Sequence, residues 1–184
     1  MAYLTRSQAR SAATVTLLVE SARTSLRKSA SAPMTATFDI FLSHSYEDAE
    51  LILGVKNLLE ARRLRVYVDW VEDNKLDRTA VNANTAEIVR QRMRRSSYLL
   101  FATTTNSSQS RWMPWELGYF DGHKPGKVGI LPLLERSGDI FAGQEYLGLY
   151  PVVEVASIPG AAPRFEVRGA AGSSNQDLRQ LISA

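Results

Sequence analysis

The chain has 184 residues, of which 45% are hydrophobic and 22% are charged, and this balance indicates a globular domain with a core rather than a disordered chain. It contains no cysteine and only two histidines, which excludes disulfide and thiolate zinc sites and disfavours a histidine-rich one, so we expect no metal and no cofactor. No apolar run is long enough to cross a bilayer, so we expect no membrane partner and a cytoplasmic location.

The net charge of +3 is concentrated near the N-terminus. Before Pro33, five basic residues against the single acid Glu20 give +4, so the remainder of the chain is close to neutral. A nucleic-acid-binding domain would carry a basic patch on its body, and nucleic acid is therefore not an expected partner.

Residues 1–33 are predicted to form a basic helical arm, and residues 34–184 a single domain. The arm has residues at helical spacing that form one continuous stripe. An organellar transit peptide is the alternative, because the segment is rich in Arg and Ser and poor in acids. The stripe consists of Leu4, Ser11, Val15, Leu18, Ala22 and Leu26.

Short apolar runs alternate with helical patterns after the arm, which predicts an α/β fold with a parallel sheet covered by helices on both faces. Ser45-Tyr46-Glu47-Asp48 has the form of a capping box that begins the first helix of the domain. In a later helix, four arginines are expected to point mostly outward: Arg90, Arg92, Arg94 and Arg95. The five expected strands are 38–42, 65–70, 98–102, 128–133 and 150–155.

Ligands of parallel sheets bind outside the carboxyl ends of the strands. Three strands end there in polar or aromatic residues, which are Ser43-His44-Ser45, Asp69-Trp70 and the hydroxyl-rich run 103–110. All three lead toward the segment 110–122. In that segment Trp112 and Glu116 are four residues apart, and Pro114 is tolerated only in the first turn of a helix.

A carboxylate close to an indole, at the positive end of a helix, favours a cation or a transition state that becomes cationic. The nicotinamide half of NAD fits this description, because its glycosidic bond breaks through an oxocarbenium-like state. The alternative is a helix that buries Trp112 and Trp115 in the core and uses Glu116 only as a partner of the helix dipole. Residue spacing alone permits both interpretations.

Three motifs in order resemble a Toll/interleukin-1 receptor (TIR) domain of bacterial type. They are the Phe38–His44 strand, the Val66–Trp70 strand with its long loop, and Trp112-x-x-x-Glu116. The sequence of residues 112–122 is similar to the corresponding segment of stand-alone bacterial TIR proteins of antiphage defence, such as the Thoeris type. The resemblance implies a flavodoxin-like fold with a five-stranded parallel sheet, and cleavage of NAD to nicotinamide and ADP-ribose or a cyclic isomer.

The resemblance also implies roles for individual residues. Glu116 corresponds to the catalytic glutamate of the family, and Trp112 to a tryptophan that shapes the pocket and influences cyclisation. The remaining substrate-binding residues are expected at the strand ends, where His44 could instead be a structural residue and Trp70 could merely anchor its loop. They are Ser43, His44, Asp69 and Trp70.

The expected partners are NAD, further TIR domains bound through the long loop 71–84, and a downstream effector that senses the product. Two alternatives to the enzyme remain. One is a scaffold that recruits TIR domains without turnover, and the other is a nucleoside-processing enzyme of similar sheet topology.

Overall fold

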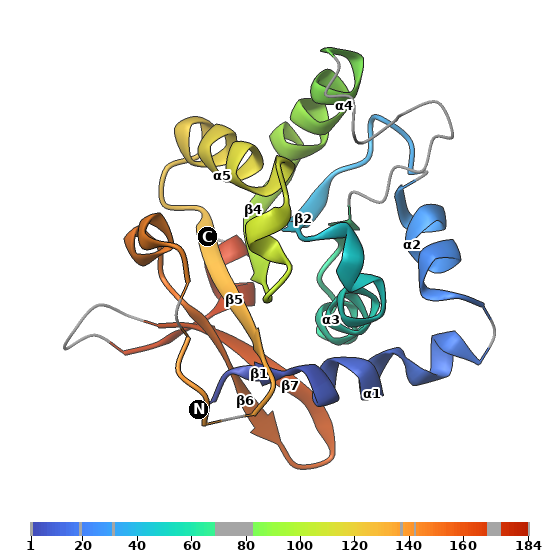
Figure 1. Ribbon diagram of the computed structural model, residues 1–184, viewed down its shortest axis with the longest axis vertical. Helices are drawn as coiled ribbons and strands as arrows, with labels where there is room; N and C mark the ends of the chain where they lie inside the picture. Colours follow the sequence, from blue (N-terminus) through green and yellow to red (C-terminus); the bar gives the residue numbers. More distant parts are fainter. Residues whose placement is uncertain are drawn as a thin grey trace.

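The structure is a computed structural model, shown in Figure 1, that describes residues 2–18, 20–30, 32–68, 83–136, 138–141, 143–168 and 174–183. Its centre is a five-stranded parallel sheet in the order β1-β5-β4-β2-β3. This confirms the predicted α/β architecture. The strands are β1 (Leu4–Thr5), β2 (Phe38–Ser43), β3 (Val66–Val68), β4 (Ser96–Thr103) and β5 (Val128–Leu134).

Helices cover both faces of this sheet, as predicted. Successive side chains of a strand point to opposite faces, and β2 shows this clearly. Ile40 and Leu42 are buried in one hydrophobic cluster with α3 (Ala49–Ala61), whereas Phe41 is buried in a second cluster with α4 (Ala83–Arg94) and α5 (Trp112–His123). Figure 1 shows α4 and α5 near the top of the view and α3 in its lower half.

The fifth strand of the parallel sheet is not the predicted segment 150–155. It is β1, near the N-terminus, which pairs with β5 and places Leu4 opposite Leu133. Val152 makes only an isolated parallel bridge to Ile130. The following residues instead form a small antiparallel sheet, because the turn at Gly160, with φ of 72°, folds β7 back on β6. Its strands are β6 (Val153–Ile158), β7 (Ala161–Val167) and β8 (Gln176–Asp177).

The short elements complete the chain. The C-terminal helix begins at Leu178, directly after β8. The antiparallel sheet and α6 pack on the side of the first hydrophobic cluster, to which Val155, Phe165 and Leu178 belong. The short elements are the 3-10 helices η1 (Tyr46–Asp48), η2 (Ser107–Gln109) and η3 (Glu145–Leu149), and the helix α6 (Leu178–Ser183).

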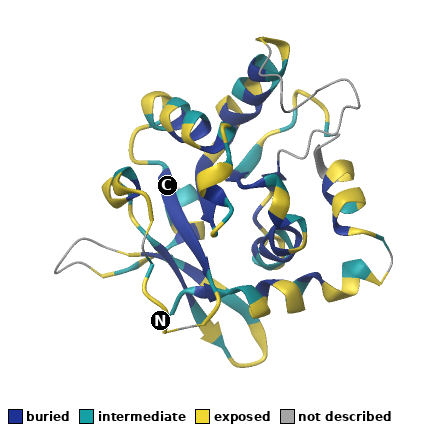
Figure 2. Cartoon of the chain, in the orientation of Figure 1, coloured by how far each residue is buried: buried dark blue, intermediate teal, exposed yellow. Residues whose placement is uncertain are grey.

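The continuous apolar stripe predicted for residues 1–33 is wrong. The segment forms two helices, α1 (Arg6–Leu17) and α2 (Ala22–Ala30), and Val15 and Leu18 of the expected stripe are 76% and 82% exposed. The buried side of α1 consists of Ala9 and Ala13, which are fully covered. Figure 2 shows most of this helix in the colours of exposed and intermediate residues. Small side chains let the backbone of α1 lie directly on α3, where a Cβ atom at Gly54 would come within 1.8 Å of the Ala9 carbonyl oxygen.

One arginine of α4 also differs from expectation. Arg92 is 3% exposed and donates hydrogen bonds to the backbone carbonyls of Ala32 and Pro33, so it points inward. Its guanidinium lies over the ring of Tyr67, 5.1 Å from the centroid. The cation is thus held by two carbonyls and an aromatic face, and it attaches the segment before β2 to the domain.

Candidate active site

Ser43 is the last residue of β2, and its side chain lies on the same face as Phe41, toward α5. Only 1% of it is exposed, and its hydroxyl donates a hydrogen bond of 2.5 Å to a carboxylate oxygen of Glu116. The two residues are 73 positions apart in sequence. The structure therefore brings the end of the first predicted strand and the acid of the predicted helix into direct contact.

Glu116 lies in the second turn of α5 and is 4% exposed. The helix begins at Trp112 with Pro114 in its first turn, as predicted, because the missing amide hydrogen of proline has no acceptor there. The hydroxyl of Ser110 accepts a hydrogen bond of 3.3 Å from the Met113 amide and satisfies one of the free donors of this end. The carboxylate thus sits near the positive end of the helix.

His44 follows Ser43 and is also buried. Its Nδ1 atom lies 3.0 Å from the carbonyl oxygen of Leu42, and since a carbonyl can only accept, Nδ1 carries the hydrogen. This bond holds the imidazole against the backbone of β2. The bond is compatible with the structural alternative for His44, and a role toward substrate stays a prediction.

Trp112 is half-buried and lies one helical turn before Glu116. Its ring meets the ring of Trp115 edge to face, with centroids 5.3 Å apart and an interplanar angle of 83°. Asp69, Trp70 and residues 71–82 of the long loop lie outside the described residues. Their predicted roles in substrate binding and self-association therefore stay predictions.

A row of aromatic rings that was not predicted from the sequence continues from Trp112 along α5. Trp115 stacks on Tyr119 with centroids 5.8 Å apart, and Tyr119 stacks on His123. From α4, Arg90 lies 5.3 Å from the centroid of Trp115, and Arg94 donates a hydrogen bond of 2.8 Å to the Tyr119 hydroxyl. The i, i+3 and i+4 spacing of these rings was the signal that could have revealed the row.

The predicted capping box at 45–48 does not form. Ser45 makes no side-chain capping bond, and the Asp48 carboxylate accepts hydrogen bonds from Thr104 and Asn106 in the segment after β4. Two side-chain donors on a neighbouring strand end compete successfully with the local backbone amide. Asp48 is 6% exposed, so this contact is an internal link between the two strand ends.

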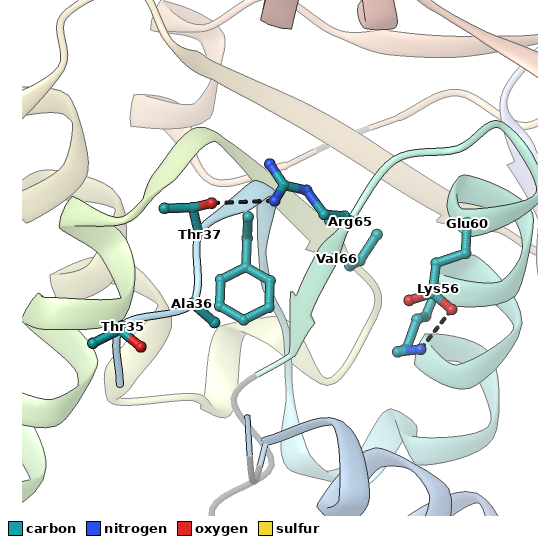
Figure 3. A pocket seen from close by; sticks show the side chains of 8 residues that line it. Thr35, Ala36, Thr37, Lys56, Glu60, Arg65 and Val66 are labelled. Atoms are coloured by element: carbon teal, nitrogen blue, oxygen red, sulfur yellow. Dashed lines mark hydrogen bonds and ion pairs between the residues drawn. The ribbon is translucent and has the colours of Figure 1, made fainter. Parts of the chain in front are cut away.

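A cavity of about 540 Å³ lies at the other end of the strands (Figure 3). It is lined by Phe38, the first residue of β2, whereas Ser43 is the last residue of that strand. Its charged residues are paired, with Lys56 2.6 Å from Glu60 and Arg65 bound to Asp39 and Thr37. The length of β2 thus separates the cavity from the Ser43–Glu116 pair.

The arrangement at Glu116 has a definite chemical capacity. A buried carboxylate, oriented by a hydroxyl and placed one helical turn from an indole, is set to stabilise positive charge that develops on a bound molecule. Preorganised groups of this kind act most strongly where water is excluded. The geometry suits a reaction with a cationic transition state.

Comparison with known proteins finds a matching family model and related proteins. A family model described as TIR domain matches residues 40–153. A protein of Bacillus cereus (strain MSX-D12), named "Probable 3' cyclic ADP-D-ribose synthase ThsB'", is 57% identical over 122 residues, which cover 66% of this chain and 63% of that protein. A protein of Cytobacillus dafuensis, named "Putative cyclic ADP-D-ribose synthase TIR2", is 32% identical over 83 residues, which cover 45% of this chain and 22% of that protein.

The chain thus spans less than two thirds of the length of either relative. Among solved structures, the TIR domain of the Toll-related receptor TRR-2 from Hydra magnipapillata aligns with a TM-score of 0.45 and 17% identity, covering 61% of this chain and 79% of that one. Within the part of the chain that the structure describes, no helix has the length and apolar character needed to cross a bilayer.

Proposed function

This chain belongs to the TIR domain family, whose model matches residues 40–153, and from that premise we propose that it cleaves the bond between nicotinamide and ribose in NAD. The observation that carries the proposal is the buried Glu116 carboxylate at the start of α5, held by the Ser43 hydroxyl at 2.5 Å. The relative of 57% identity is named a cyclic ADP-ribose synthase, which supports the same chemistry.

In the proposed reaction, the C1′–N bond of NAD lengthens and positive charge develops on the ribose, as in glycoside hydrolysis. The Glu116 carboxylate faces this charge and lowers the barrier. Nicotinamide leaves as a neutral molecule, so its departure needs no general acid. NAD is the substrate in this scheme, and the chain's own residues supply the catalytic groups.

Two products are possible from the ribosyl cation. Water gives linear ADP-ribose, whereas an internal nucleophile of the same molecule gives a cyclic isomer. The name of the relative from Bacillus cereus specifies the 3′ cyclic form. We propose that a cyclic isomer is formed here, and that Trp112 shapes the pocket in which the two ends of the ADP-ribosyl group join. Ser43, His44, Asp69 and Trp70 complete the proposed substrate site.

The proposed biological role is a signal in antiphage defence, in which a separate effector protein senses the cyclic product. Self-association of TIR domains through residues 71–84 brings the enzyme into its active form. The alternative function is a scaffold that binds other TIR domains without turnover. A scaffold has no use for a buried acid oriented by a serine hydroxyl, and this contact favours the enzyme.

The test is to incubate the purified chain with NAD and to follow nicotinamide release by chromatography, both dilute and after forced clustering on a surface. Nicotinamide together with a cyclic or linear ADP-ribose product supports the proposal. Inactivity in the clustered state supports the scaffold, and cleavage of free nucleosides alone supports a nucleoside-processing enzyme.

A further inference from the structure

The segment between β4 and α5 is a compact turn that determines where α5 begins. The Thr104 amide donates to the Ser107 hydroxyl at 2.8 Å, and the Asn106 amide donates to the Thr104 hydroxyl at 3.0 Å. Ser107 is itself buried. Only a few residues separate this turn from Trp112, the first residue of α5, so its position fixes the start of the helix that carries Glu116.

Asp48 holds this turn from the side of β2. One carboxylate oxygen accepts from the Thr104 hydroxyl at 2.6 Å, and the other accepts from the Asn106 side-chain amide at 2.8 Å. Hydrogen bonds to an ionised and largely buried acceptor are among the stronger ones in proteins. Asp48 lies five residues after Ser43, which touches Glu116 directly. Residues 43–48 therefore contact the β4–α5 segment through Asp48 and α5 itself through Ser43.

Arg6 reaches the same turn from the N-terminal segment. Its guanidinium donates to the Thr105 hydroxyl at 3.0 Å and to the Leu133 carbonyl at 3.4 Å, and it forms an ion pair with Glu135. The Arg6 side chain is 16% exposed, although it lies outside residues 40–153 that match the family model. A residue beyond the matched domain thus contacts the segment that leads to Glu116.

We propose that Asp48 and Arg6 are positioning residues of the active site, which clamp residues 104–107 from two sides so that α5 presents Glu116 to Ser43. The inference rests on the proposed NAD cleavage for its kinetic consequence. By this proposal both residues act on the position of α5 and not on the substrate itself. The N-terminal segment is by this account part of the catalytic unit.

The sharpest test reverses the polarity of one bond. Asp48→Asn removes a charged acceptor, and we expect kcat for NAD to fall about 10- to 100-fold with KM changed less than about twofold, since a small displacement of a catalytic group has effects of that size. The double variant Asp48→Asn with Asn106→Asp restores a carboxylate–amide pair in the opposite direction. We expect it to recover most of the lost kcat.

A second pair of variants keeps the test valid if Asp48→Asn is poorly folded. Thr104→Val is nearly isosteric and loses the hydroxyl donor, whereas Thr104→Ser retains it, so only the valine variant should lower kcat. For the other side of the clamp, Arg6→Met should lower kcat severalfold. Glu135→Gln is the matched control, because the Glu135 side chain is 63% exposed and an ion pair with an exposed partner contributes little.

Amide hydrogen exchange gives a readout that does not depend on turnover. In Asp48→Asn we expect faster exchange at residues 104–116 and unchanged exchange in β3. If the wild type releases no nicotinamide, the proposed function fails. Hydrogen exchange at residues 104–116 still tests whether Asp48 and Arg6 hold this segment. Unchanged exchange and kcat in Asp48→Asn, or a lower melting temperature with kcat unchanged, would overturn the role of Asp48. The same result for Arg6→Met would overturn the role of the N-terminal segment.

Discussion

The Ser43 hydroxyl donates a 2.5 Å hydrogen bond to the Glu116 carboxylate, joining the end of β2 to the second turn of α5. A hydrogen bond to a charged group contributes about 1.5 to 3 kcal/mol. We therefore expect Ser43→Ala to lower kcat for NAD by about tenfold or more, because the carboxylate loses the group that orients it. Steady-state nicotinamide release measures this effect.

Ser45→Ala is the matched control for that substitution. Ser45 is buried two residues away, and its hydroxyl makes no capping bond to η1. We expect its kcat to stay within about threefold of the wild type, since the hydrogen bond that orients the Glu116 carboxylate comes from Ser43 and not from Ser45. Equal losses in both variants would mean that the segment as a whole, and not the bond to Glu116, limits the rate.

Gly54 is required where α1 crosses α3. A methyl group at this position would lie 1.8 Å from the Ala9 carbonyl oxygen, which is backbone and cannot turn aside. We expect Gly54→Ala to lower the free energy of unfolding by about 1 to 3 kcal/mol, the usual cost of overpacking. Urea denaturation followed by circular dichroism measures the change.

Gly122→Ala provides the contrast within another helix. Nothing lies within 4 Å of a Cβ atom at Gly122 in α5, so the substitution adds helix propensity without a clash. We expect an increase in the free energy of unfolding of up to about 1 kcal/mol. If Gly54→Ala behaved in the same way, the close packing of α1 on α3 would be wrong.

Arg92 provides a second test of stability. It is 3% exposed and donates to the carbonyls of Ala32 and Pro33, so Arg92→Met leaves two acceptors without these donors. We expect a loss of about 1 to 3 kcal/mol in the free energy of unfolding. Arg90→Met on the same helix, whose side chain is 34% exposed, should lose less than about 1 kcal/mol. A reversed order of the two variants would contradict the inward position of Arg92.

Trp112 tests the proposed control of the product. The ring lies one turn before Glu116 and is supported by Trp115 at 5.3 Å. We expect Trp112→Ala to shift the products from the cyclic isomer toward linear ADP-ribose, because water gains access to the ribosyl cation. Trp112→Phe keeps a ring and should retain more of the cyclic product. Chromatography of the reaction mixture measures the ratio, and an unchanged ratio in Trp112→Ala would refute this role.

Much of the fold followed from periodicity in the sequence. The run around Phe41 was expected to be a buried strand, and the helix at Trp112 was expected from Pro114. These features depend on local patterns, which can be recognised in the sequence without knowledge of the tertiary contacts. The pairing of Glu116 with a strand end also followed from the rule that parallel strands end at one edge of the sheet.

The features that were missed depend on contacts between distant segments. β1 has two residues, too few to show an alternating pattern, and it is a strand because it pairs with β5. Arg92 is buried because two carbonyls 59 and 60 residues away accept its hydrogen bonds. Asp48 does not form the predicted capping box, because its carboxylate accepts hydrogen bonds from Thr104 and Asn106 of a distant segment. A propensity cannot reveal such partners.

The most direct measurement of the central claim compares nicotinamide release from NAD by the wild type, by Glu116→Gln and by Glu60→Gln under clustered conditions. Glu60 lines the cavity at the opposite end of the strands and forms an ion pair there with Lys56, so it provides the same chemical change away from the site. We expect release by the wild type and by Glu60→Gln, and release at background level by Glu116→Gln. Equal release by all three proteins would contradict the assignment of Glu116 as the catalytic residue.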